Sequence, residues 1–225
     1  MRPRSLRPPR ARLLAAALAL VCLCVATALL LARGAEQDKP LALSERVWEP
    51  GEAPAAARPG KSHATSDAAA FVDQIEDSLV RATPGEAAKT LSDAGFQRAV
   101  AREYEADDAG AVSVAIQLRD PNAATGVLEW SNKDALSPCP GECNVDITAF
   151  DVKEIPDARG VKRLREQGAQ GAGPNHPFES YEISFVDGPV LYVVRTEGDP
   201  GASDRAGLVH AARQLYRRVR GRPLP

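Results

Sequence analysis

The sequence lacks the short motifs that mark common catalytic and phosphate-binding sites. It has no Gly-x-Ser-x-Gly elbow, no His-Glu-x-x-His zinc motif and no glycine-rich phosphate loop. Neither His176, in a predicted loop, nor His210, on the last predicted helix, has a nucleophile that the sequence can assign to it. Carboxylates are abundant but fall in predicted turns and strand faces, as Asp107 and Asp108 do. We therefore expect no catalytic residue, no cofactor and no metal.

Charge is absent from one long stretch near the N-terminus. Residues 13–32 form an apolar run, LLAAALALVCLCVATALLLA, and five arginines precede it in the basic segment 1–12. A helix of this length rises about 1.5 Å per residue and spans roughly 30 Å, the thickness of the bilayer core. We expect a transmembrane anchor or uncleaved signal, with the basic end in the cytoplasm and the remaining chain outside it. A cleaved signal peptide stays open as the alternative, because Ala32-Arg33-Gly34 is a poor but acceptable cleavage site.

Basic residues are in deficit beyond that run. The first 35 residues hold six arginines and no acid, so the remainder has 22 basic and 30 acidic residues. Such an acidic surface does not suit phosphates, and we expect no nucleic-acid partner. Five arginines nevertheless cluster near the C-terminus: Arg213, Arg217, Arg218, Arg220 and Arg222. Their position at a helix C-terminus explains much of this clustering, and a patch for anionic cell-wall polymer or lipid headgroups is the alternative.

Large apolar side chains are sparse between residues 34 and 65. This stretch is rich in proline, glycine and alanine, with isolated apolar residues such as Val47 and Trp48. Segments of this composition cannot offset the entropy of ordering, so we predict a flexible linker over 34–65. Residues 66–222 have the composition of a globular domain and are long enough for one core.

The patterns within residues 66–222 predict an α+β fold. Thr83, Pro84 and Glu86 have the spacing of a capping box with proline at the first helical position. Asp187-Gly188 separates two alternating runs and predicts a hairpin. The predicted helices are 66–82, 83–95, one beginning at 121, and 203–221, and the predicted strands include 96–104, 112–118, 145–149, 181–185 and 190–194. This order predicts an antiparallel sheet with packed helices.

Two segments of the predicted domain follow the same plan. Each runs from an alternating strand into Asp-Pro-x-Ala and then a helix, at Asp120-Pro121-Asn122-Ala123 and at Asp199-Pro200-Gly201-Ala202. A duplicated ββα unit would explain this similarity. The frequent use of Asp-Pro to leave a strand explains it equally well, and both interpretations stay open.

Cysteine is scarce, and only Cys139 and Cys143 lie outside the apolar run. In an oxidising exterior we expect a disulfide between them, because Pro140-Gly141 supplies a tight reversal. A redox pair is the alternative, yet catalytic dithiols use Cys-x-x-Cys at a helix start, whereas three residues intervene here. A metal site would need two more ligands, and outside the apolar run the sequence has no second cysteine pair and no His-x-His.

Several features between residues 90 and 220 together resemble a known group of proteins. They are the helical Trp130, the cysteine pair, the turn Ile155-Pro156-Asp157-Ala158, the strand Val190 to Val194 and the terminal segment Gln214 to Val219. This pattern resembles uncharacterised actinobacterial surface proteins that are membrane-anchored or secreted. Its layout is similar to extracellular sensor domains of mycobacterial receptor kinases and to PsbP-like sandwiches. The resemblance implies a binding role and no reaction.

We therefore expect a non-enzymatic binding or interaction domain outside the cytoplasm, held to the cell membrane by a single N-terminal pass. Its partner would be a protein or a cell-wall component that the sequence does not identify. A secreted carrier of a small apolar ligand is the first alternative, since a sheet packed against helices can enclose a cavity. A thiol oxidoreductase acting through Cys139 is the second, and it requires an accessible thiol of low pKa.

Overall fold

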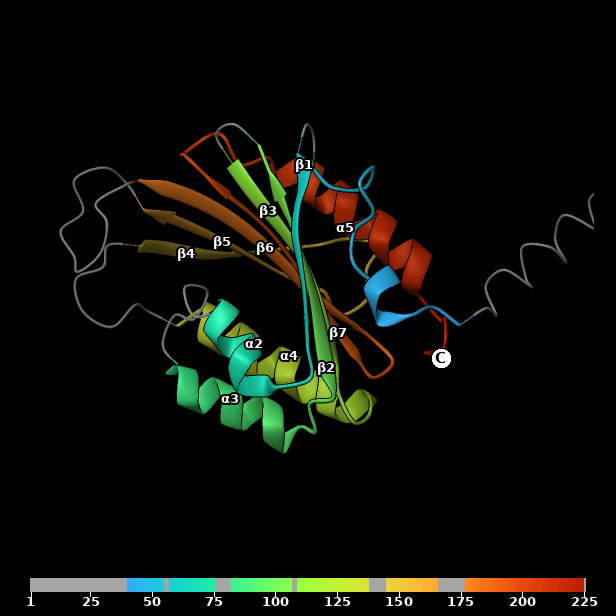
Figure 1. Ribbon diagram of the computed structural model, residues 1–225. Helices are drawn as coiled ribbons and strands as arrows, with labels where there is room; N and C mark the ends of the chain where they lie inside the picture. The colour runs from blue at the N-terminus through green and yellow to red at the C-terminus, as the bar shows by residue number, and fades with distance from the viewer. Residues whose placement is uncertain are drawn as a thin grey trace, which may run out of the picture. The chain divides into compact units, whose positions relative to one another are not determined.

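The fold of the described residues is an antiparallel sheet packed between helices (Figure 1). The computed structural model describes residues 40–54, 57–75, 82–106, 109–137, 145–165 and 177–224. The strands lie in the order β1-β2-β3-β7-β6-β5-β4, and every neighbouring pair is antiparallel. The elements are η1 (Leu43–Glu45), β1 (Arg58–Thr65), α2 (Ala68–Ile75), α3 (Pro84–Asp93), β2 (Arg98–Glu105), β3 (Ala109–Gln117), α4 (Pro121–Ala135), β4 (Val145–Phe150), β5 (Arg159–Arg165), β6 (Phe178–Asp187), β7 (Val190–Gly198) and α5 (Arg205–Val219). The predicted α+β class is confirmed.

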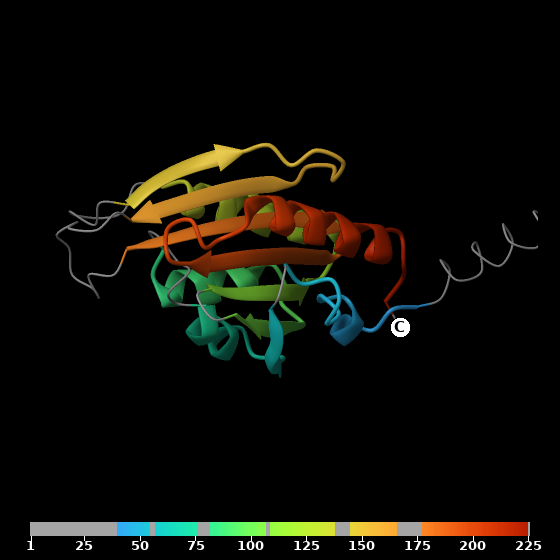
Figure 2. The same ribbon diagram turned by 90° about the horizontal axis from the view of Figure 1, so that it is seen from above.

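Helices cover both faces of the sheet, and each face has its own core. One core joins α5 and the η1 segment to residues of the central strands, among them Ala115. The other joins α2, α3 and α4 to the opposite face, where Val114 lies. Figure 1 shows these two groups of helices on either side of the sheet, and Figure 2 shows α5 running along the strands. We call the two sides the α5 face and the α4 face.

Local sequence signals account for the helix starts. Thr83 Oγ1 accepts a hydrogen bond from the Glu86 N–H at 3.3 Å, and the Glu86 carboxylate accepts one from the Thr83 N–H at 2.9 Å. Asp120 caps α4 by accepting from the Ala123 N–H at 2.8 Å, and Asp204 caps α5 in the same way. These bonds satisfy amide groups that have no partner within the first helical turn. The predicted capping box and the predicted start of the last helix are confirmed.

The predicted hairpin at Asp187-Gly188 is also confirmed. Asp187 in β6 lies opposite Val190 in β7, and Gly188 has a φ of 59°. Glycine adopts this left-handed conformation without the steric cost that a side chain would bring. The hairpin places β7 beside β3, where Val114 and Val193 lie opposite each other near the centre of the sheet.

The arrangement of α4 and α5 decides between the two interpretations of the Asp-Pro-x-Ala repeats. Antiparallel neighbours such as β3 and β7 are exchanged by a twofold axis perpendicular to the sheet, which would keep both following helices on one face. Instead Leu128 of α4 packs on the α4 face, and Leu208 of α5 packs on the α5 face. The structure therefore favours Asp-Pro as a recurrent exit from a strand over a duplicated ββα unit.

The flexible linker predicted over 34–65 is wrong for its described part, residues 40–54 and 57–65. Val47 and Trp48 are fully buried in the α5-face core, and residues 58–65 form β1. The Trp48 N–H donates to Ser113 Oγ at 3.1 Å, and its indole Nε1–H donates to the Ala211 carbonyl at 3.3 Å. A few large side chains inserted into a core order this segment, although its average composition is that of a linker.

Two further predictions fall outside the described residues. They are the transmembrane segment 13–32 and the disulfide between Cys139 and Cys143. Within the described part of the chain, no helix combines the length and the apolar character that a membrane crossing requires.

Candidate functional site

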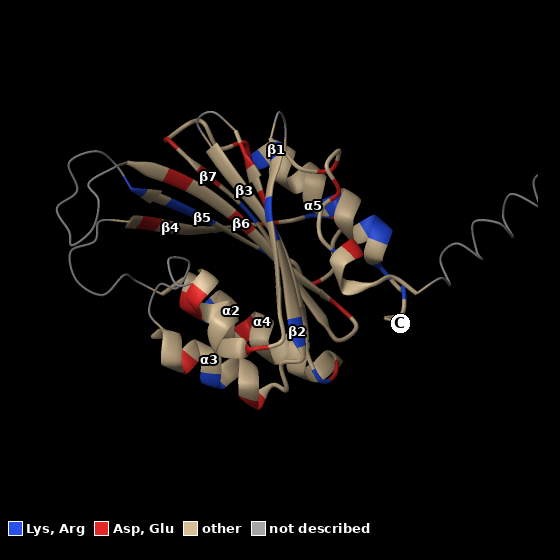
Figure 3. Cartoon of the chain, viewed as in Figure 1, with Lys and Arg blue, Asp and Glu red and all other residues tan. Residues whose placement is uncertain are grey.

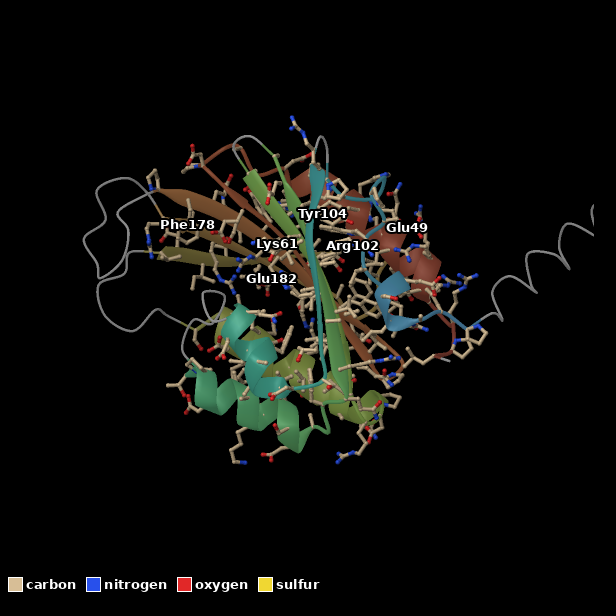
Figure 4. The ribbon with its side chains drawn as sticks, in the orientation of Figure 1. Glu49, Lys61, Arg102, Tyr104, Phe178 and Glu182 are labelled. Carbon is tan, nitrogen blue, oxygen red and sulfur yellow. The ribbon has the colours of Figure 1, made fainter. Side chains whose placement is uncertain are left out.

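A cleft of about 1010 Å³ opens on the α4 face of the sheet. Its floor is formed by β2, β3, β7, β6 and β5, and its wall by α2, α3 and α4. Figure 4 labels Phe178 and Glu182, two residues of β6 that line it. The volume is that of sites that hold drug-sized molecules. The cleft is therefore the candidate functional site.

One part of the cleft is apolar. Its floor there consists of β-branched and leucine side chains from the two central strands β3 and β7, and aromatic and aliphatic side chains from α2, α3 and α4 face them. The residues are Val112, Val114, Ile116, Leu191 and Val193 on the floor, and Phe71, Ile75, Leu91, Val127 and Trp130 on the helices. The half-buried Trp130 presents a large aromatic surface to this region. Such a lining favours hydrocarbon and aromatic groups over water.

The other part of the floor is charged, with opposite signs on adjacent strands. Glu182 of β6 lies directly opposite Arg195 of β7 in the strand register. Arg163 Nη1 lies 3.4 Å from Glu182 Oε2, and Arg195 Nη2 lies 3.1 Å from Glu197 Oε2. Figure 3 shows both acidic and basic positions on this group of strands. Cross-strand pairs of opposite charge stabilise a sheet, and these four also give the cleft a polar end.

Arg163 is the most deeply buried of these charged residues. Its side chain is 9% exposed, and its contact with Glu182 at 3.4 Å is long for a charge-assisted hydrogen bond. Its Nε is buried and has no hydrogen-bond partner. Among the described residues, Thr196 Oγ1 is the other buried side-chain atom in this condition. The β5 strand thus holds an incompletely paired guanidinium in the floor of the cleft.

The far end of the cleft is lined by His63 and Glu103. Their side chains are 39% and 46% exposed, and His63 Nε2 lies 3.5 Å from Glu103 Oε1. The predicted linker would leave His63 in solvent, but β1 places it opposite Ala101 of β2. The pairing of β1 with β2 therefore brings a residue of the first strand to the site.

Asp134 fixes one wall of the cleft. This buried residue of α4 accepts a hydrogen bond from the Ala82 N–H through Oδ1 at 2.7 Å. The bond links the end of α4 to the segment that enters α3, and both helices line the cleft. Asp134 thus helps to set the shape of the wall.

A second charged cluster surrounds Glu179, on the α5 face. Lys162 Nζ lies 2.6 Å from Glu179 Oε1, the Tyr181 hydroxyl donates to the same oxygen at 3.0 Å, and the Gly201 N–H donates to Oε2 at 3.1 Å. Burial acts to raise the pKa of the Glu179 carboxyl, but these hydrogen bonds together lower the pKa below its usual value. The Glu179 carboxylate is engaged on both oxygens, and it joins β6 to the turn before α5.

The predicted arginine cluster near the C-terminus is largely engaged within the fold. Arg213 and Arg217 both pair with Glu154, at 3.6 and 3.1 Å. Arg218 pairs with Glu52 at 2.5 Å and donates to the Val47 carbonyl at 2.8 Å. These contacts support the structural interpretation of the cluster over an anion-binding patch.

The remaining candidate residues are Cys139, Cys143, His176 and His210. Cys139, Cys143 and His176 lie outside the described residues. His210 is exposed on α5, where Nε2 lies 3.0 Å from Gln214 Nε2. In the described ranges, no three or more His, Cys, Asp or Glu side chains are grouped to hold a metal ion.

Sequence reasoning missed the charged floor of the cleft. Its residues come from β5, β6 and β7, and the predicted strands did not include β5. The alternation of Val161, Arg163 and Arg165 with Lys162 and Leu164 in β5 was the available signal. The basic residues of β5 obscured the alternation of apolar and polar residues that marks a half-buried strand, because both faces of this strand carry charge.

Comparisons with known proteins concern the fold. No family model and no curated protein matches the sequence. Among solved structures, the extracellular domain of PknH from Mycobacterium tuberculosis has 15% sequence identity and a TM-score of 0.51, and the match covers 80% of this chain and 97% of that domain. The fold is similar to a kinase extracellular domain. A putative uncharacterized protein from Mycobacterium smegmatis, an Rv0999 ortholog, has 13% identity over 72% of this chain and 87% of that one, with a TM-score of 0.38.

The first likeness agrees with the layout that the sequence predicted. At this identity it concerns the arrangement of strands and helices and no ligand. The assignment of a ligand must come from the cleft itself.

Proposed function

We propose that this chain is a non-enzymatic extracytoplasmic binding domain that holds a small amphiphilic ligand in the cleft on the α4 face. The observation that carries the proposal is the joint presence of an apolar lining and a charged floor in one cavity of about 1010 Å³. Buried apolar surface supplies affinity, and a few fixed polar groups orient the ligand. The proposal unites the predicted binding role with the alternative of a carrier for an apolar molecule.

The pairing of charges in the cleft supports binding over catalysis. General acid and base groups need environments that separate their affinities for protons. Here Glu182 and Glu197 each face an arginine, as in sites that recognise charge. The thiol oxidoreductase alternative has no support among the described residues, since Cys139 and Cys143 lie outside them.

The apolar run at residues 13–32 completes the proposal. A segment that crosses the membrane once would anchor the domain and leave the cleft outside the cytoplasm. Extraction of cell membranes with alkaline carbonate tests this part. The full chain should remain in the membrane fraction, and a chain with residues 13–32 deleted should not enter it. Recovery of a shortened chain in the soluble fraction would favour a cleaved signal.

Binding is tested by filling the cleft. Val193 lines the apolar floor, whereas Val209 of α5 packs against the core of the other face. We expect Val193→Trp to weaken binding of the neutral fluorophore 1-aminoanthracene by about tenfold or more, because the larger side chain occupies the cleft. The matched variant Val209→Trp should retain binding. Equal affinity in both variants, with both folded by circular dichroism, would remove the cleft as the binding site.

A further inference from the structure

We infer that the ligand of this cleft carries an anionic head group, a carboxylate or a phosphate, that pairs with Arg163. This inference rests on the binding function proposed above and names the chemical class of the ligand. The ligand is a small amphiphile with one anionic group at the charged floor and an apolar body along the helices α2 and α4.

The hydrogen bonding of Arg163 is the first observation. The guanidinium presents five N–H donors in a planar fork that fits the two oxygens of a carboxylate or phosphate. The side chain is 9% exposed, and within the described part of the chain it contacts Glu182 at 3.4 Å while Nε has no acceptor. A buried donor without a partner costs free energy that a bound acceptor recovers. The missing partner of Arg163 is therefore an acceptor.

The carboxylates around the cleft either have a partner or lie exposed to solvent. Glu103 faces His63, Glu197 pairs with Arg195, and Asp134 accepts from the Ala82 N–H. Two further acidic residues on the lining, Glu105 and Asp199, are exposed to solvent. Water satisfies exposed carboxylates at little cost, so these two groups create no demand for a cationic ligand.

The strand register determines which charged side chains of the floor lie next to one another. Glu182 lies opposite Arg195 on β7 and contacts Arg163 on β5, so one carboxylate lies between two guanidinium groups. Thr196, whose Oγ1 is the second such atom in the described part of the chain, precedes Glu197 on β7 and faces the opposite side of the sheet from Arg195. Arg163 lines the cleft, so the residue with the unmet donor belongs to the charged floor, where each of the two guanidinium groups has a carboxylate beside it.

The apolar region begins next to this charged row. Val193 is two residues from Arg195 on β7, which corresponds to about 7 Å along the strand. Trp130, Val127 and Ile75 lie on the helices that face it. A head group at Arg163 would thus leave the rest of the ligand against apolar side chains, and an inorganic anion would leave that surface unused.

The experiment compares four ten-carbon probes that differ only in their head group. Decanoate, decyl phosphate, decanol and decylammonium are titrated by calorimetry into the full chain held in lipid nanodiscs, with empty nanodiscs as the blank. We expect the two anions to bind at least about tenfold more tightly than decanol and decylammonium. Inorganic phosphate is the fifth titrant and should bind more weakly than decyl phosphate, because it lacks the apolar body.

Variants connect this preference to Arg163. Arg163→Gln should abolish the preference for anions while leaving the affinity for decanol unchanged, and Arg163→Lys should retain part of it, because lysine keeps the charge without the fork. Glu182→Gln removes the competing carboxylate and should increase the affinity for decanoate. The control Arg98→Gln changes an exposed arginine of β2 and should have no effect.

The outcomes separate this inference from the proposed function. Two results would overturn the inference that an anionic head group pairs with Arg163. One is binding of decylammonium that is as tight as that of the anions or tighter, and the other is a preference for anions that survives in Arg163→Gln. Either result leaves the proposed binding function in place. Equal binding of inorganic phosphate and decyl phosphate overturns the inference that the ligand has an apolar body. No binding of any probe to the folded chain removes the proposed function itself.

Discussion

The guanidinium of Arg46 donates a 2.8 Å hydrogen bond to the hydroxyl of Tyr192 in the interior of the protein. The same side chain donates from Nε to the Leu41 carbonyl at 3.1 Å and from Nη2 to the Pro223 carbonyl at 3.0 Å. It also donates to the carbonyl of Arg222. One buried arginine thus joins the segment around Leu41, the central strand β7 and the tail after α5.

This junction predicts a strong stability effect at Arg46. Arg46→Ala leaves the Tyr192 hydroxyl and several carbonyl groups without their donor, and we expect it to lower the free energy of unfolding by about 3–5 kcal/mol. Urea unfolding of the full chain in nanodiscs, followed by circular dichroism, measures the change. Arg98→Ala, at an exposed position, should change stability by less than about 0.5 kcal/mol. A loss below about 1 kcal/mol at Arg46 would show that the junction contributes little.

Tyr192 predicts a loss of stability at alkaline pH. Burial raises the pKa of its hydroxyl to about 12, even though the Arg46 guanidinium acts to lower it. The folded pKa lies above the ordinary value of about 10. The protonated Tyr192 hydroxyl therefore makes its full contribution to the free energy of unfolding below pH 10, and this contribution is lost as the pH rises toward 12. Phenolate absorbance should show this late titration, and Tyr192→Phe should remove it. Titration of all tyrosines near pH 10 in the folded protein would contradict the expectation.

The contacts of Glu179 predict that the fold loses stability at acidic pH. Burial acts to raise the pKa of this carboxyl, but hydrogen bonds from Lys162, Gly201 and Tyr181 lower it overall. A lowered folded pKa stabilises the fold above the unfolded value of about 4.3, and that contribution disappears as the pH falls below it. Glu179→Gln should therefore reduce the dependence of unfolding free energy on pH below about 5. The control is Glu129→Gln, which changes an exposed acid on α4. It should leave the dependence of unfolding free energy on pH in this range as it is in the original chain.

The two tryptophans should differ in their contribution to stability. Trp48 is fully buried, and its ring packs edge-on against Tyr104 with centroids 6.0 Å apart. Trp48→Ala should lower the free energy of unfolding by about 3–5 kcal/mol, because it leaves a large cavity. Trp130 is half-buried in the cleft wall, so Trp130→Ala should cost less. Equal losses in chemical denaturation would contradict the placement of residues 41–48 in the core.

The cysteine pair remains a prediction from the sequence. We expect intact mass spectrometry of the exported chain to show a mass lower by about two hydrogens than that of the reduced chain, as a Cys139–Cys143 disulfide requires. Reduction followed by alkylation should then label both residues. Labelling of both thiols without prior reduction would contradict the disulfide and return attention to the redox alternative.

Local signals in the sequence predicted the elements whose partners are close along the chain. The capping residues Thr83, Asp120 and Asp204 begin helices because their side chains bond amides three residues later. The Asp187-Gly188 hairpin joins strands that are adjacent in the chain. Helix caps and a tight hairpin can be predicted from a short stretch of sequence, since neither depends on the rest of the fold.

Segments whose structure depends on distant partners were missed. β1 has almost no apolar residues, and it is a strand because its backbone pairs with β2 at the sheet edge. β5 carries charge on both faces and is held between β4 and β6. The burial of Trp48 depends on Ser113 and Ala211, far along the chain. Composition averages over a window and does not register such contacts.

The sequence by itself determined the α+β class, the helix starts and the main hairpin, because short-range hydrogen bonds and periodic burial encode them. Only the tertiary structure decided that α4 and α5 take opposite faces and that residues 41–65, where described, belong to the fold. It also brought Arg163, Glu182 and Arg195 from three strands into one cleft beside Trp130 of α4. The physical reason is that the pairing of distant strands sets which side chains share a face, and burial on that face sets which donors lack a partner.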